Sequence, residues 1–245
     1  LPEDLDFLNA STREARAIRE ALRPLARKLA ARLARKRRTN RDARLDFRRT
    51  MRRSLSTGGT PVDLVFRKPH PSRPELIVLA DISGSVATFA AFTLQLVYAL
   101  RTEFTRVRTF VFVDSIVEVT EMMEKAENIV DVTHRINQEA SGARIYGGSD
   151  YGAALQLFQR RWGEQVRRTS TVIILGDARN NYLAAREESL AAVAERARAV
   201  YWLNPESVSS WNDGDSIVRR YAPHCDGFFE CRNIRQLRAF VERLD

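Results

Sequence analysis

The feature that most constrains the fold of this chain is a short apolar run that ends in an Asp-x-Ser-x-Ser pentad. Residues 76–80 are continuously apolar, which predicts a strand buried on both faces of a sheet. The pentad follows at once, with Asp81, Ser83 and Ser85, and residues 88–104 continue with helical periodicity. A strand that turns into a helix in this way places a carboxylate and two hydroxyls at the carboxyl end of a parallel sheet, where open α/β sheets bind ligands.

The side chains of the pentad are all hard oxygen donors. Such donors suit Mg²⁺, Mn²⁺ or Ca²⁺ and are poorly suited to a soft metal. Asp and Ser are also common where a strand turns into a helix, because they cap helices, so the pentad alone is compatible with an ordinary helix cap. Two later segments favour the cation site.

These two segments carry oxygen donors in similar positions. Residues 147–152 read Gly-Gly-Ser-Asp-Tyr-Gly and precede a predicted helix. The two glycines permit unusual backbone angles that bring the hydroxyl of Ser149 close to a ligand, and the alternative is that Ser149 or Asp150 only caps the helix. Residues 171–175 form a second fully apolar strand, which leads directly to Asp177.

Predicted strands alternate with predicted helices along the rest of the chain. This alternation predicts an α/β fold with a doubly wound, mostly parallel six-stranded sheet and one antiparallel edge strand. If strands 76–80 and 171–175 are neighbours whose helices leave on opposite faces, they flank the topological switch point, and their loops converge there. The remaining strands are predicted at 107–113, 116–120 (the antiparallel edge), 199–203 and 227–230, and the remaining helices at 122–138, 151–162, 183–197, 216–221 and 233–244.

The positive charge of the chain is concentrated near its start. Residues 1–60 carry 17 basic and 7 acidic side chains, whereas residues 61–245 are nearly neutral. We therefore expect a basic, mainly helical extension over 1–60 and one domain over 61–245. The extension contains a leucine-rich stripe at helical spacing, with Pro24 expected to kink or split the helix. Its arginines are either solvated or form a surface for nucleic acid or an acidic partner, through residues 13–53.

Cysteine content and hydropathy indicate the class of protein. The two cysteines, Cys225 and Cys231, are expected to be free thiols, which suits a reducing compartment such as the cytoplasm. No apolar run reaches the roughly 18 residues that a membrane helix requires, and no signal peptide is visible after Leu1. We therefore expect a cytoplasmic protein without a membrane partner.

The three loops together resemble the metal-ion-dependent adhesion site (MIDAS) of the von Willebrand factor A (VWA) domain. The Asp-x-Ser-x-Ser motif maps to Asp81, Ser83 and Ser85, the family's loop-two Thr maps to Ser149, and its loop-three Asp maps to Asp177. Within this superfamily, with its Rossmann-like sheet, the chain is similar to the CoxE-like group. That further resemblance rests on four segments in order, namely residues 48–55, 57–59, 147–149 and 202–205.

The resemblance implies a binding function rather than catalysis. It implies that these five residues hold Mg²⁺, or Mn²⁺ or Ca²⁺, and that the cation accepts an acidic residue from another protein. It also implies an adaptor that works with a MoxR-type AAA+ ATPase in protein remodelling or metalloenzyme maturation. Two departures concern details of the site: Ser149 replaces the usual Thr, and the sequence after Asp177 lacks the common glycine.

Two other functions remain open on the sequence. One is nucleic-acid binding through the basic N-terminal segment, which would weaken steeply with salt. The other is a Mg²⁺-dependent phosphate-processing enzyme with Asp81 as its nucleophile. The enzyme reading is disfavoured because none of the three loops contains Lys, and the chain has no Gly-x-x-x-x-Gly-Lys phosphate loop.

Overall fold

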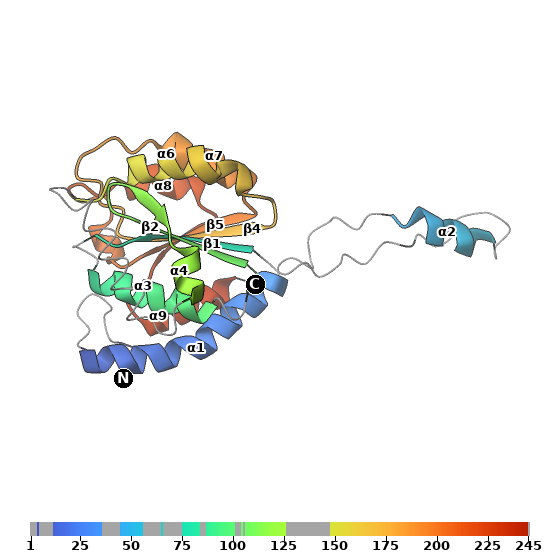
Figure 1. Cartoon of the computed structure of the whole chain (residues 1–245), viewed down its shortest axis with the longest axis horizontal. Helices are drawn as coiled ribbons and strands as arrows, with labels where there is room; N and C mark the ends of the chain where they lie inside the picture. Colours follow the sequence, from blue (N-terminus) through green and yellow to red (C-terminus); the bar gives the residue numbers. More distant parts are fainter. Residues whose placement is uncertain are drawn as a thin grey trace.

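The computed structural model of the chain describes most of a layered α/β domain (Figure 1). Ser85, one of the predicted ligands, lies outside the described residues, as does most of the helix predicted over 122–138. The described residues are 4, 12–35, 45–55, 65, 75–83, 87–100, 104, 106–125 and 148–244.

Six strands form a single sheet in the order β3-β2-β1-β4-β5-β6. All neighbouring pairs are parallel except β2 with β3, which is antiparallel at one edge. The predicted sheet is therefore confirmed, including its antiparallel edge strand. The strands are β1 (Glu75–Asp81), β2 (Arg106–Phe112), β3 (Ile116–Glu118), β4 (Ser170–Leu175), β5 (Ala199–Asn204) and β6 (Gly227–Glu230).

Strands β1 and β4 lie side by side at the centre of the sheet, with Leu79 opposite Ile174 and Ala80 opposite Leu175. The chain leaves β1 toward β2 and leaves β4 toward β5, in opposite directions across the sheet. The gap between the carboxyl ends of β1 and β4 is therefore the topological switch point. Both strands consist of apolar runs because helices cover both faces of the sheet and leave no face for water.

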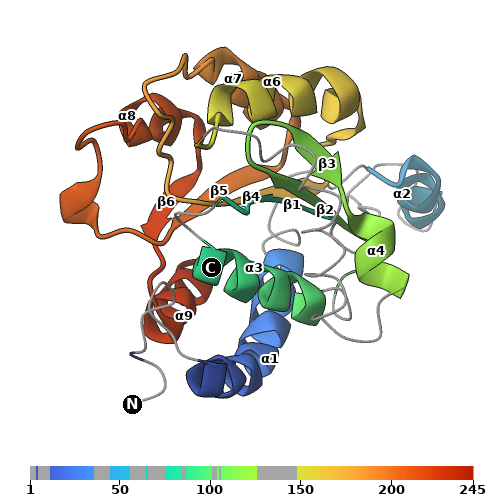
Figure 2. The same ribbon diagram turned by 60° about the vertical axis from the view of Figure 1, so that its left-hand side comes forward.

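Helices cover the sheet on both sides (Figures 1 and 2). One layer contains α1, α3 and α9, and the other contains α6, α7 and α8; each side has its own apolar core. The α-helices are α1 (Thr12–Arg35), α2 (Phe47–Ser54), α3 (Ala87–Leu100), α4 (Thr120–Lys125), α6 (Tyr151–Trp162), α7 (Glu187–Arg196), α8 (Val218–Tyr221) and α9 (Ile234–Arg243). Short 3₁₀ turns span Gly163–Gln165, Val208–Ser210 and Ala222–His224.

Helix α1 packs its leucine stripe against α3 and α9. The described part of the stripe is buried as predicted, from Leu22 to Leu33. Pro24 lies inside the helix, which continues through it as one element, so the helix is not split, and the alternative of a kink stays a prediction. The guanidinium of Arg32 donates to the carbonyl of Glu242 in α9 at 2.7 Å. The division into an extension over 1–60 and a domain over 61–245 stays a prediction.

The helix predicted over 183–197 begins later than expected. Helix α7 starts at Glu187, and the residues before it form a loop. Asn181, Tyr182 and Arg186 all have positive φ, which ends any regular helix, and the hydroxyl of Tyr221 donates to the carbonyl of Ala185 at 2.8 Å. The loop therefore has a fixed conformation.

Both cysteines are free thiols, as predicted. Burial raises the pKa of the Cys225 thiol to about 12, so this thiol stays protonated at neutral pH. Among the helices that the structure describes, none combines the length and the hydropathy that a membrane span requires.

Candidate functional site

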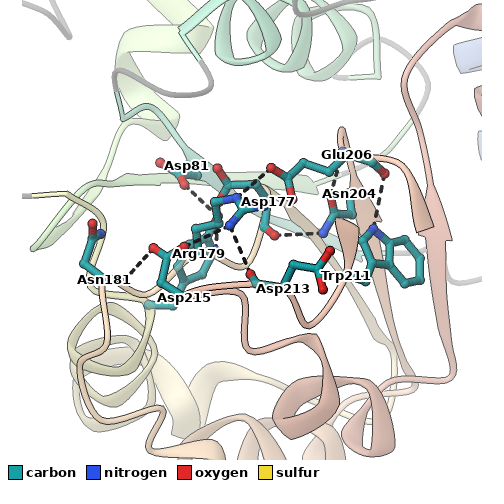
Figure 3. Close-up of polar contacts among 10 residues, drawn as sticks. Asp81, Asp177, Arg179, Asn181, Asn204, Glu206, Trp211, Asp213 and Asp215 are labelled. Carbon is teal, nitrogen blue, oxygen red and sulfur yellow. Dashed lines mark hydrogen bonds and ion pairs between the residues drawn. The ribbon is translucent and has the colours of Figure 1, made fainter. Parts of the chain in front are cut away.

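The candidate site lies at the switch point, where the loops after β1 and β4 meet the start of α6. Figure 3 shows Asp81 and Asp177 together there. Asp81 is the last residue of β1 and is completely buried. Asp177 lies two residues beyond the end of β4 and is 2% exposed. Ser149, also buried, precedes the Asp150 that caps α6. The structure thus brings together three predicted ligands that are far apart in the sequence.

Asp81 accepts hydrogen bonds from all sides of the site. The Ser83 N–H donates to Asp81 Oδ1 at 2.7 Å. The hydroxyl of Ser149 lies 3.3 Å from Oδ1 and 3.1 Å from Oδ2. The hydroxyl of Tyr151 donates to Oδ2 at 2.6 Å. These donors are neutral, so they orient the carboxylate without neutralising its charge.

Tyr151 connects the two carboxyl groups. Its hydroxyl also lies 3.2 Å from Asp177 Oδ1. A phenol has only one proton, so it cannot donate to both carboxylates at once. A proton on one of the two carboxyl groups, or a cation between them, would relieve the repulsion between these buried groups.

The turn after β4 is built to admit the tyrosine hydroxyl. A Cβ atom on Gly176 would lie 2.1 Å from that hydroxyl, so only glycine leaves room for it. Two residues further along the turn, Ala178 has a φ of 60°. Two side chains from β5 hold the turn: the Trp202 Nε1–H donates to the Gly176 carbonyl, and the Asn204 Nδ2–H donates to the Asp177 carbonyl, at 2.8 and 2.9 Å.

Two asparagines after Asp177 join the β4 loop to the start of α6. The Tyr151 N–H donates to Asn180 Oδ1 at 2.7 Å, and the Asn181 Nδ2–H donates to the Ser149 carbonyl at 2.9 Å. Gly148 is required beside them, because a Cβ atom there would lie 2.1 Å from the Asn181 amide. The loops that carry Ser149 and Asp177 are therefore held as one unit.

Arg179 ties the site to the loop after β5 (Figure 3). Its backbone N–H donates to Asp177 Oδ1 at 2.9 Å. Its guanidinium pairs with Glu206 at 2.6 Å and with Asp215 at 2.9 Å. The hydrogen bond that the guanidinium donates to Glu206, and the one that it donates to Asp215, raise its pKa above the ordinary value, although desolvation opposes them. This arginine is thus matched by two carboxylates of its own.

Burial dominates the electrostatics of the two site carboxyls. Desolvation raises the pKa of Asp81, although the hydrogen bonds from Tyr151, Ser83 and Ser149 oppose it. Desolvation, followed by the charge of Asp81, raises the pKa of Asp177 to about 6. Two buried carboxylates of like charge are costly without a proton or a cation between them.

The donor set differs from that of an all-carboxylate or histidine site. Within the described part of the chain, no group of three or more His, Cys, Asp or Glu residues is arranged to hold a metal ion. The donors that do converge are two carboxylates, Asp81 and Asp177, together with the hydroxyls of Ser149 and Tyr151. Such oxygen donors suit a hard cation that retains several waters.

Sequence reasoning did not find every residue of the site. It named Ser83 and Ser149 as cation ligands, and the structure places both beside Asp81, while their role as ligands stays a prediction. It gave no role to Tyr151 or Asn180. A polar signal for Tyr151 was present, since a tyrosine at the first position of a helix that begins at the carboxyl edge can direct its hydroxyl toward that edge.

One family of known proteins matches most of the chain. The sequence profile of the family described as "VWA domain containing CoxE-like protein" matches residues 18–240. No curated protein matches the chain.

Two solved structures are similar, each with 14% identity and a TM-score of 0.45. One is an aerotolerance-related membrane protein from Bacteroides fragilis NCTC 9343 with multiple mutations to serines; the match covers 69% of this chain and 97% of that one. The other is a von Willebrand factor type A protein from Catenulispora acidiphila; the match covers 74% of this chain and 43% of that one. Since the family profile covers most of the sequence, the chain belongs to the family of CoxE-like proteins that contain a VWA domain.

Proposed function

We propose that this chain is a protein-binding adaptor whose contact with its partner depends on a divalent cation. The cation is bound at the switch point by Asp81, Ser149 and Asp177, with Ser83 and Ser85 completing the set. When bound, it supplies an open coordination position for a carboxylate of the partner protein. Family membership supports the adaptor role, because CoxE-like VWA proteins generally bind other proteins rather than catalyse reactions.

One observation carries the cation dependence: two buried carboxyl groups contact a single tyrosine hydroxyl. Asp81 and Asp177 come from neighbouring strands, and neither is open to solvent. Their mutual repulsion and desolvation would be relieved by a hard cation that both can ligate. The residues present therefore fit Mg²⁺ or a similar ion.

Among the residues that the structure describes, the site offers the cation only two carboxylates. This small negative charge suits a cation that also binds a partner protein better than one that is held tightly as a structural ion. Two carboxylates satisfy only part of the coordination of Mg²⁺, which otherwise retains water. A carboxylate from a partner can replace one of these waters and add negative charge to the site. Cation and partner should therefore each increase the affinity of the other.

The loop after β4 gives this partner a second point of contact. Tyr182 is 83% exposed, and Leu183 beside it is about half exposed. The neighbouring Asn181 is hydrogen-bonded to the carbonyl of Ser149, so the exposed pair lies on the same loop unit as two of the ligands. Large exposed apolar side chains on a rigid loop are typical of binding surfaces.

The identity of the partner follows from the resemblance to the CoxE-like group. We infer that the chain works in the cytoplasm with a MoxR-type AAA+ ATPase, in protein remodelling or metalloenzyme maturation. In this role the VWA domain would present a client protein to the ATPase, or recruit the ATPase to the client.

The test is a binding experiment with the immobilised chain and a purified MoxR-type ATPase from the same source. We expect binding in an excess of Mg²⁺ of about 5 mM, loss of binding in EDTA, and recovery when Mg²⁺ is restored. Asp81→Ala should bind in neither condition, whereas the exposed control Asp114→Asn should behave as the natural chain. Equal binding in Mg²⁺ and in EDTA would contradict the cation dependence, and no binding in either would contradict the choice of partner.

A further inference from the structure

Helix α2 carries an exposed apolar stripe next to a strongly basic face. Phe47 is 68% exposed, Leu55, which directly follows the helix, is 76% exposed, and Met51 between them is 42% exposed. Four of the eight large apolar side chains that are exposed among the described residues lie within 45–55. This concentration marks α2 as an interaction surface rather than an ordinary solvent-facing helix.

The helix is locally well formed, so the stripe does not arise from a frayed segment. The Asp46 carboxylate caps it by accepting the Arg49 N–H at 3.1 Å. The Asp46 N–H donates to the Val65 carbonyl at 2.7 Å, and the Val65 N–H donates to the Thr50 hydroxyl at 3.0 Å. Thr50 and Ser54 are buried. One side of α2 is therefore covered, and the apolar stripe borders it.

The stripe is narrow. Each residue turns the helix by about 100°, so positions four apart are offset by about 40° around the helix axis. The stripe of residues 47, 51 and 55 therefore spans about 80°. Arg48 and Arg52 lie beside the stripe on the helix surface, and both are exposed. Helix α2 contains no acidic residue. A narrow apolar seam with basic side chains along one border is the pattern of a helix that lies in a groove.

The chemistry of α2 argues against two other classes of partner, nucleic acid and a membrane surface. Met51 and Leu55 gain nothing from phosphates, so nucleic acid would leave most of the apolar seam exposed. A membrane surface binds a helix in proportion to the apolar area that it buries, and three apolar side chains on and beside an eight-residue helix offer little. A protein groove can cover the seam alone.

We propose that α2 docks into an apolar groove on a partner protein, and that carboxylates along the rim of that groove pair with Arg48 and Arg52. The arginines fix the orientation of the helix, and the apolar seam supplies the affinity. This contact uses no residue of the cation site. It is therefore independent of Mg²⁺ and gives the chain a second, separate attachment point.

The experiment places a photo-crosslinking benzoylphenylalanine at Phe47 of the full chain, expressed in its source cells, with Val117 on β3 as the control position. We expect crosslinks from position 47 that map by mass spectrometry to a protein segment lined by apolar residues and flanked by Asp or Glu. The double variant Arg48→Glu with Arg52→Glu should lose them. The matched variant Arg167→Glu with Arg168→Glu, which also reverses two exposed arginines, should keep them.

The crosslinked protein is then purified and its affinity measured in EDTA. Phe47→Ser with Leu55→Ser should weaken binding by about tenfold or more, with an unchanged melting temperature, because both side chains are exposed in the free chain. Crosslinks to lipid, to nucleic acid or to the chain itself would overturn the proposal. So would crosslinks that do not exceed those from position 117, or binding that survives both double variants.

Discussion

The substitution Asp177→Asn tests the electrostatic basis of the site in the metal-free chain. Asp177 is 2% exposed, and its pKa is raised from 3.8 to about 6, first by desolvation and then by Asp81. A carboxyl whose pKa is higher in the folded state binds its proton more tightly when folded. Its contribution to stability is complete below about pH 4, falls between pH 4 and 6, and is lost above pH 6.

The shift of about two pKa units corresponds to about 3 kcal/mol of folding free energy above pH 6. Asparagine has no charge to desolvate, and its Oδ1 can still accept the Arg179 N–H that Asp177 accepts. In EDTA at pH 7.5, Asp177→Asn should therefore raise the free energy of unfolding by up to about 3 kcal/mol. For a chain of this size, that is about 6–12 °C in melting temperature.

The assay is urea or thermal unfolding at pH 4 and at pH 7.5, with and without Mg²⁺. The gain from Asp177→Asn should disappear at pH 4, and Mg²⁺ should stabilise the natural chain but not the variant. Asp114→Asn, at an exposed turn, is the control for loss of a charge. The reasoning is refuted if Asp177→Asn lowers stability in EDTA at pH 7.5, or if the natural chain and the variant show the same dependence on pH.

Three further predictions concern single residues of the site. Gly176→Ala should destabilise the chain by about 1–3 kcal/mol in urea unfolding, because the new Cβ would overlap the Tyr151 hydroxyl; an unchanged unfolding midpoint would contradict the packing described for the turn. Ser149→Ala should weaken Mg²⁺ binding by about tenfold in calorimetry while the circular dichroism spectrum stays the same, since it removes one neutral donor. Tyr182→Ala should weaken partner binding by about tenfold without changing Mg²⁺ affinity or melting temperature, and an unaffected partner would remove Tyr182 from the interface.

The sheet could be predicted from the sequence because its strands are short apolar runs bounded by polar turns. Residues 76–80 and 171–175 have no polar face, so they had to lie in the middle of a covered sheet. The alternation of strands and helices predicted a mostly parallel sheet but left the strand order open, and the structure places these two strands side by side. The meeting of Asp81 and Asp177 was a consequence of this order, since parallel neighbours end at the same edge.

The loop over 178–186 could not be predicted in the same way. Ala178, Asn181, Tyr182 and Arg186 have positive φ, although local rules reserve this conformation mainly for glycine. Contacts with distant segments impose it: the Asn180 N–H donates to the Asp215 carbonyl, and the Asn181 N–H donates to the Asp215 carboxylate. The late start of α7 follows from these contacts.

The bridging role of Tyr151 also depends on tertiary structure. In the sequence it reads as a core aromatic on the buried side of a helix, and most of its ring does pack in the core, against Phe112 and Trp202. Its hydroxyl reaches the carboxylates only because Gly176, in the turn after β4, has no side chain in the way. No local pattern encodes that space.

The central claim is that Asp81 and its neighbours bind a divalent cation. Isothermal titration of Mg²⁺ into the metal-free chain and into Asp81→Ala, both at pH 7.5, tests it most directly. The account predicts a saturable heat with about one ion per chain for the natural sequence and none for the variant, with both proteins folded by circular dichroism. The same Mg²⁺ uptake by the two proteins would contradict it.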